Sequence, residues 1–165
     1  MKKIFLTLVL LLAAVATVSA QKLESGSVQA LKDAHKVNLT FEFVTIHSMD
    51  EKSFGEYEKD WFKDKPEVIG LFTDKANDAL KGTLTLGNFK NSDYTINVIV
   101  NAISAKGNYD CDVVLLKQGK EIAKITGLTG RGGKIGTKLN LIKDGAQSTG
   151  KQLGKILKKE LKSQS

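Results

Sequence analysis

Three consecutive stretches in the second half of the chain alternate apolar with polar residues, and this pattern constrains the fold most. They cover residues 94–103, 109–117 and 122–126, and the first is the strongest. A period of two is typical of strands that bury one face. Gly107 and Gly119 lie in the short connections between the stretches, where tight turns are expected. The pattern therefore predicts antiparallel strands that follow one another as a meander.

Two further strands and three helices are predicted around these strands. Residues 37–46 alternate Val, Leu and Phe with polar residues, and residues 83–89 alternate weakly, which adds a fourth strand to the meander. Apolar residues recur every three or four positions in residues 48–65, 66–81 and 137–162. This spacing is typical of helices that bury one face.

Local signals predict where the first two helices begin and end. Ser48 is suited to be an N-cap, and Glu51 three residues later completes a capping box. A residue before proline avoids the helical region, so we expect the first helix to end at Lys65 and the second to begin at Pro66. Gly82 is suited to the position just after a helix C-terminus.

The last predicted helix carries three interior glycines, Gly145, Gly150 and Gly154. Each destabilises a helix by about 1 kcal/mol relative to alanine. Such a cost indicates either a neighbour that approaches closely or a kink.

The predicted order is β-α-α-β-β-β-β-α, which favours an α+β fold with two layers. Helices would pack on one face of a mainly antiparallel sheet of about five strands. Residues 21–34 are polar and mixed, and we expect a loosely packed lead-in there. Residues 21–165 are sufficient for a single globular domain with a hydrophobic core.

Residues 1–20 have the pattern of a secretory signal peptide. Lys2 and Lys3 precede an apolar run at residues 4–16, and small residues surround Ala20. The run is shorter than the ~20 residues that cross a bilayer, so we expect cleavage and no transmembrane span afterwards. The sequence thus predicts export to the periplasm or the extracellular space. The residue directly after the predicted cut is Gln21 and not cysteine, so a lipoprotein anchor is not expected.

Positive charge is concentrated near the end of the chain. Residues 131–162 hold nine Lys or Arg residues and two acidic ones. This segment alone therefore accounts for a net charge equal to the +7 of the whole chain. We expect a partner or membrane surface on the last helix, formed by Lys151, Lys155, Lys158 and Lys162. The alternative is an ordinary packed helix with a solvated lysine face. No aromatic residues are interleaved with these lysines, so a nucleic-acid partner is not predicted.

A glycine-rich stretch connects the last strand to the last helix, a context suited to anion binding. The motif departs from a P-loop, because Gly133-Lys134 is followed by Ile135 instead of Ser or Thr. It departs from the dinucleotide pattern too. Two interpretations remain: a plain linker, or an anion site formed by Arg131, Lys134 and Lys138.

Catalytic and metal-binding motifs are incomplete. Cys111 lies at an inward-facing position of its predicted strand. We therefore favour a buried, unreactive thiol over a catalytic dyad of Cys111 with His35 or His47. Two isolated histidines and one cysteine do not match zinc spacing. Oxygen atoms of Asn108, Asp110 and Asp112 share one strand face, which is either a calcium site or a solvated face. No catalytic residues, metal site or cofactor are predicted.

The chain after the predicted cut resembles small exported Bacteroidetes proteins that have no assigned role. The residues that carry the resemblance are the signal end at 19–21, the strand at 37–43, the helix with Trp61, and the glycine-rich turn that leads to residues 149–155. In element order the chain is also similar to small α+β domains of envelope accessory proteins. Examples are the amino-terminal domain of the Tol-system propeller protein and the curli secretion lipoprotein. These likenesses imply an envelope-linked, non-catalytic role and assign no functional residues.

Three functional hypotheses follow. The first is an exported, non-enzymatic, envelope-associated protein that binds a protein partner or another ligand. The second is a peripheral protein that docks its basic C-terminal helix on anionic lipid or polymer. The third is an enzyme that uses the glycine-rich loop.

Overall fold

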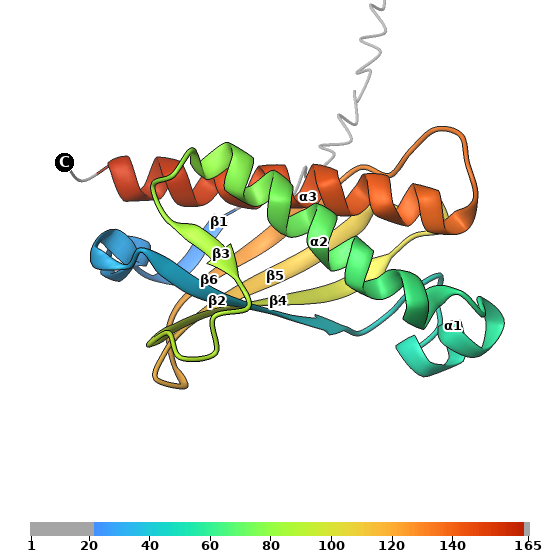
Figure 1. Ribbon diagram of the computed structural model, residues 1–165, viewed down its shortest axis with the longest axis horizontal. Helices are drawn as coiled ribbons and strands as arrows, with labels where there is room; N and C mark the ends of the chain where they lie inside the picture. The colour runs from blue at the N-terminus through green and yellow to red at the C-terminus, as the bar shows by residue number, and fades with distance from the viewer. Residues whose placement is uncertain (1–21, 164–165) are drawn as a thin grey trace, which may run out of the picture.

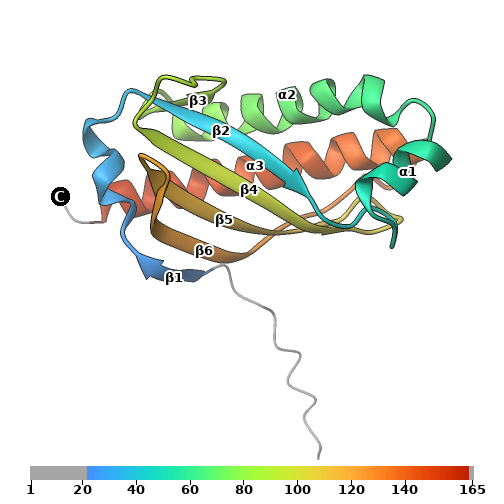
Figure 2. The same cartoon turned by 90° about the horizontal axis from the view of Figure 1, so that it is seen from below.

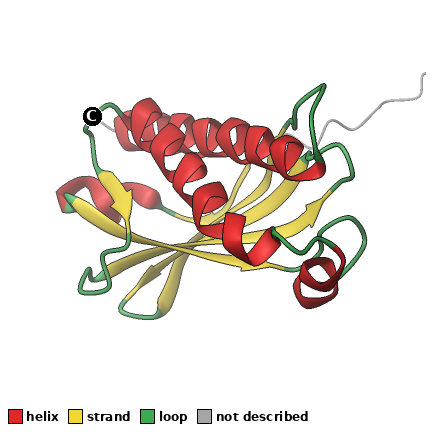
Figure 3. Cartoon of the chain, turned by 45° about the vertical axis from the view of Figure 1, so that its right-hand side comes forward, coloured by secondary structure: helices red, strands yellow, loops and turns green. Residues whose placement is uncertain are grey.

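The computed structural model describes residues 22–163, which form an α+β fold of two layers (Figure 1). Helices α2 (Trp61–Leu80) and α3 (Lys138–Lys162) lie side by side over one face of an open sheet, and α1 (Glu51–Tyr57) lies beyond them at one end (Figure 3). The predicted α+β fold, with helices on one face, is confirmed. The predicted signal peptide at residues 1–20 lies outside the described residues.

The sheet has six strands in the order β1-β6-β5-β4-β2-β3 (Figure 2). The strands are β1 (Lys22–Gly26), β2 (Lys36–Phe43), β3 (Thr85–Gly87), β4 (Tyr94–Ile103), β5 (Tyr109–Lys117) and β6 (Lys120–Gly130). β4, β5 and β6 form the predicted antiparallel meander, and β1 extends it as an antiparallel edge strand.

The other edge of the sheet differs from the prediction, because β2 pairs in parallel with both β3 and β4. The chain crosses from β2 to β3 through two helices, and such a crossover returns it to the same end of the sheet. The short loop at residues 88–93 then carries the chain across the start of β2. The predicted four-stranded meander is therefore wrong at β3.

The segment before β2 is more ordered than expected. β1 pairs with β6, and a short 3-10 helix, η1 (Val28–Asp33), follows it. Val28 and Leu31 of η1 are almost fully buried, and the Gln29 amide donates to the carbonyl of Glu160 near the end of α3. The expected loose lead-in is thus a packed part of the domain.

The boundary between the first two helices also differs from the prediction. Asp50, and not Ser48, caps α1, because its carboxylate accepts a hydrogen bond of 2.9 Å from the Ser53 N–H. Pro66 lies inside α2, which begins at Trp61. Trp61 is fully buried, and its ring centroid lies 5.4 Å from that of Phe43. Tertiary packing of this indole, rather than the proline, places the start of α2.

Close packing of α3 explains two of its three interior glycines directly. A Cβ added at Gly150 would overlap the Phe72 carbonyl of α2, and one at Gly154 would overlap the Ala76 carbonyl. The remaining interior glycine, Gly145, lies equally close to Gly107 beside the sheet. Of the two explanations considered for these glycines, a close neighbour or a kink, the structure shows the close neighbour.

Candidate functional site

A basic groove lies where the C-terminal halves of α2 and α3 run side by side. Its volume is about 420 Å³. We call it the lysine groove. It is lined by Lys75, Asp78, Ala79 and Lys81 from α2 and its C-cap, and by Lys151, Lys155 and Lys158 from α3.

The two helices are fixed in a parallel orientation along the groove. Near their starts, the Lys143 ammonium bonds the carboxylates of Asp64 at 2.9 Å and Glu67 at 2.8 Å. Toward their ends, Gly154 lies against Ala76. Because glycine has no side chain, the backbones of α2 and α3 approach closely at these contacts. The lysines lie on either side of the line along which the two helices touch.

Helix geometry brings the lysines to one face. Lys151, Lys155 and Lys158 are spaced by four and three residues, which places them above one another on α3. Lys81 follows the last residue of α2 in the left-handed conformation, with a φ of 52°. That conformation turns the chain out of the helix at the end of the groove.

Positive charges repel one another in this region. The pKa of Lys158 is lowered from its ordinary value, first by partial removal of water and then by the nearby ammonium groups of Lys162 and Lys81. Asp78 offsets part of this charge, because its carboxylate lies 3.5 Å from the Lys75 ammonium. Asp78 is the single acid among the described residues that line the groove.

Helix dipoles account for only some of the lysines on α2 and α3. Lys159 and Lys162 lie in the last turn of α3, where cations stabilise the helix end. Lys75, Lys151 and Lys155 lie outside the last turns, so the dipole does not explain their presence. A cationic lining built from two helices indicates an anion-binding surface.

A second, smaller hollow lies on the other side of α3. Its volume is about 250 Å³. We call it the β1 hollow. It is lined by Leu23 of β1 and by Gln152, Lys155, Ile156, Lys159 and Glu160 of α3. Lys155 lines both this hollow and the lysine groove, so the two concavities meet at its side chain.

The structure gathers most of the lysines predicted for a partner surface. Lys151, Lys155 and Lys158 line the groove, and Lys162 lies near enough to Lys158 to affect its pKa. The contribution of α2 was not predicted, because exposed lysines on one helix do not show which helix lies beside them. The sequence signal that could have found it is the pair of glycines four residues apart on α3.

The glycine-rich loop presents a less favourable site for an anion. The Lys138 ammonium bonds the Tyr57 hydroxyl and lies 4.2 Å from the centre of its ring. The Arg131 N–H donates to the Ser148 hydroxyl, so this backbone donor is already used. Asp144 adds a negative charge directly beside Gly133. Lys134 is exposed. An anion site formed by Arg131, Lys134 and Lys138 stays a prediction.

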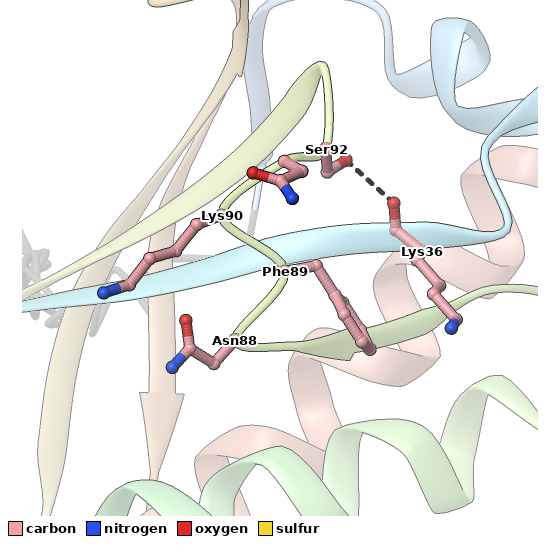
Figure 4. Close-up of a pocket in the computed structure, with 6 residues that line it drawn as sticks. Lys36, Asn88, Phe89, Lys90 and Ser92 are labelled. Atoms are coloured by element: carbon pink, nitrogen blue, oxygen red, sulfur yellow. Dashed lines mark hydrogen bonds between the residues drawn. The ribbon is translucent and has the colours of Figure 1, made fainter.

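A third concavity, not predicted from the sequence, lies where the loop at residues 88–93 crosses β2 (Figure 4). The Ser92 hydroxyl fixes the loop by donating to the Lys36 carbonyl at 2.8 Å. The Lys36 ammonium lies 5.3 Å from the centre of the Phe89 ring. Lys90 and Asn88 point to the other side of that ring (Figure 4). The ring separates the two cations, so they do not converge on one point.

The structure places the candidate catalytic and metal residues without assembling a site. Cys111 is fully buried, and burial, with Asp110 and Asp112 nearby, raises the pKa of its thiol far above the ordinary value. The Asn108 side-chain oxygen accepts a hydrogen bond from the Gly132 N–H at 2.9 Å. Among residues 22–163, no three His, Cys, Asp or Glu side chains are grouped so that they could hold a metal ion.

Comparison with known proteins gives distant similarity. No family model matches the chain, and no curated protein matches it. Among solved structures, it is similar to a PelC dodecamer from Paraburkholderia phytofirmans, with 12% sequence identity and a TM-score of 0.38. That match covers 81% of this chain and 94% of the PelC chain. In the described part of this chain, every helix is too short or too polar to cross a bilayer.

Proposed function

We propose that this chain is an exported, non-enzymatic binding domain whose anionic ligand lies in the lysine groove. The observation that carries the proposal is the convergence of five lysines from two helices on one hollow, with one carboxylate among them. Ammonium groups that share a hollow repel one another, and a bound anion relieves that repulsion. An anion therefore gains more binding free energy in the groove than it would beside scattered surface lysines.

The packing of α3 supports ligand binding over insertion into a lipid bilayer. A helix that lies in a membrane interface buries its own apolar face among the lipids. In α3 that face is already covered, because Ile142, Leu153 and Leu157 are almost fully buried against the rest of the domain. The lysine side chains remain at the surface, so they are available to an anion in solution.

Titration of the purified protein with a short oligouronate tests the proposal. Trigalacturonate binding is measured by calorimetry for the unchanged protein and for a variant with Lys151→Gln and Lys155→Gln. We expect affinity to fall more than about tenfold, since a hydrogen bond to a charged group contributes about 1.5 kcal/mol or more. Lys63→Gln with Lys120→Gln is the matched control, because it removes equal charge from exposed positions outside the groove. Equal losses in both variants would show that net charge, and not the groove, governs binding.

The export part of the proposal has a separate test. Amino-terminal sequencing of the protein from its native host is expected to give Gln21 as the first residue. A chain that still begins at Met1 contradicts export by a cleaved signal peptide and leaves the binding test unaffected.

A further inference from the structure

The lysine groove and the β1 hollow lie on either side of Lys155, and we call the two concavities together the track. Lys155 lines both, so a ligand that leaves the groove over this side chain enters the hollow. Residues 151–160 of α3 cover the length of the track along the helix. At 1.5 Å per residue this is roughly 14 Å, and crossing α3 from one side to the other adds about 10 Å, the helix diameter, so the path is longer than three sugar residues can span. A track of this length, with cations along it, is suited to a chain more than to a compact ion.

Cations are present on both sides of the crossing point. Lys151 and Lys158 face the groove, while Lys159 lines the β1 hollow. One compact anion could not contact lysines on both sides of α3. A linear ligand with repeated negative groups could contact them in turn.

Each concavity also contains one carboxylate, and this identifies a second requirement on the ligand. Asp78 lines the groove, and Glu160 lines the hollow. A carboxylate only accepts hydrogen bonds, so it repels a ligand that offers acceptors alone, such as polyphosphate. A ligand with hydroxyl donors beside its acidic groups can satisfy the carboxylates and the lysines together. Gln152 adds an amide that both donates and accepts.

The track is partly apolar as well. Ala79 lines the groove, and Leu23 and Ile156 line the hollow. The aliphatic stems of the lysines extend this surface. Sugar rings present C–H groups that such a surface can cover, whereas a phosphate chain has none.

We propose that the ligand is a linear acidic polysaccharide that runs from the lysine groove over Lys155 into the β1 hollow. This inference rests on the proposed function and specifies its ligand. Carboxylates of the polymer pair with lysines on both sides of α3. Its hydroxyl groups donate to Asp78 and Glu160.

The test compares short and long galacturonate oligomers on the purified protein. We expect dodecagalacturonate to bind at least about tenfold more tightly than trigalacturonate, because the long chain engages both concavities at once. Gln152→Ala with Lys159→Gln alters only the β1 hollow. This variant is expected to lose the gain from length while its affinity for trigalacturonate stays unchanged.

Two results would overturn the inference while leaving the proposed function intact. One is trigalacturonate binding with no gain from added length, or a gain that survives in the hollow variant. The other is equal or tighter binding of polyphosphate or polyglutamate of the same charge, which would show that charge alone selects the ligand. If neither oligouronate binds, the proposed function and this inference both fail.

Discussion

Gly150 of α3 lies against the backbone of Phe72 in α2, so closely that an added Cβ would fall 2.8 Å from the Phe72 carbonyl carbon. This contact sets the separation of the two helices that form the lysine groove. The glycine is therefore expected to matter both for stability and for the shape of the groove.

Gly150→Ala is predicted to destabilise the protein by about 1–3 kcal/mol, the usual cost of overpacking, even though alanine favours helices. Urea unfolding measures the change. Gly70→Ala in α2 is the matched control, because an added Cβ there meets nothing within 4 Å. That control should be neutral or more stable by up to about 1 kcal/mol. Stabilisation by both substitutions would contradict the close contact.

The hydrogen bond between Trp61 and Glu51 gives a second prediction. The buried indole N–H donates to the Glu51 carboxylate at 3.1 Å, and the same carboxylate pairs with Lys65 at 2.6 Å. Glu51→Ala leaves the indole without its partner and should cost about 1–3 kcal/mol. Glu51→Gln retains an acceptor and should cost less. Because Trp61 is the one tryptophan in the chain, its fluorescence reports unfolding in both variants. Equal losses would indicate that the ion pair, and not the hydrogen bond, is responsible.

Stability is predicted to depend on His47 in mildly acidic solution. Burial, with a smaller contribution from Lys138, lowers the pKa of His47 below its ordinary 6.5, against an opposing effect of Glu58. The unfolded chain then binds the proton more readily than the folded one, so stability falls as the pH drops below 6.5 and is unaffected well above it. His47→Asn should flatten this part of the curve, since asparagine tolerates the φ of 50° found there. Denaturant midpoints between about pH 5.5 and 7.5 check the sign. An unchanged slope in the variant would exclude His47 as the cause.

The protein is predicted to take up protons when it binds an anion in alkaline solution. Neighbouring lysines and partial loss of water lower the pKa of Lys158, and a bound anion favours the charged ammonium. As the pH approaches the ordinary lysine pKa of 10.5, a larger share of Lys158 than of an unperturbed lysine is neutral in the free protein, and that share gains a proton when the ligand binds. Calorimetry in buffers of different ionisation enthalpy measures the uptake. Lys158→Gln should reduce it, whereas Lys120→Gln should not.

The sequence predicted the elements that local patterns specify. Alternation and turn residues define β4, β5 and β6, and helical spacing defines α3. β1 was missed because its residues, Lys22–Gly26, include a single large apolar side chain, Leu23, and so show no alternation. Its position depends on pairing with β6, which local sequence does not encode.

Tertiary contacts decided the features that were predicted wrongly. The parallel pairing of β2 depends on the path of the chain through α1 and α2. The start of α2 follows from the burial of Trp61, which outweighs the local effect of Pro66. In both cases packing between distant segments, and not the local sequence, decided the outcome.

The part of the lysine groove that belongs to α3 could be predicted from the sequence, and the part that belongs to α2 could not. Charge and periodicity identified Lys151, Lys155 and Lys158 on α3, because these signals lie within one helix. Lys75 and Lys81 join them only through the packing of α2 on α3. The proposal that the glycine-rich loop binds an anion was based on its position between a strand and a helix, and sequence did not show that Asp144 lies beside that loop.

The parallel pairing of β2 with β4 also imposes an order on folding. β4, β5 and β6 pair with their neighbours in sequence, so short chain segments suffice to form them. β2 joins β4 through partners such as Asn38 and Thr95, which are 57 residues apart. Closing so long a segment costs chain entropy before any contact compensates for it. We therefore expect the three-stranded meander to form early and β2 to complete the sheet late, together with the helices that connect them.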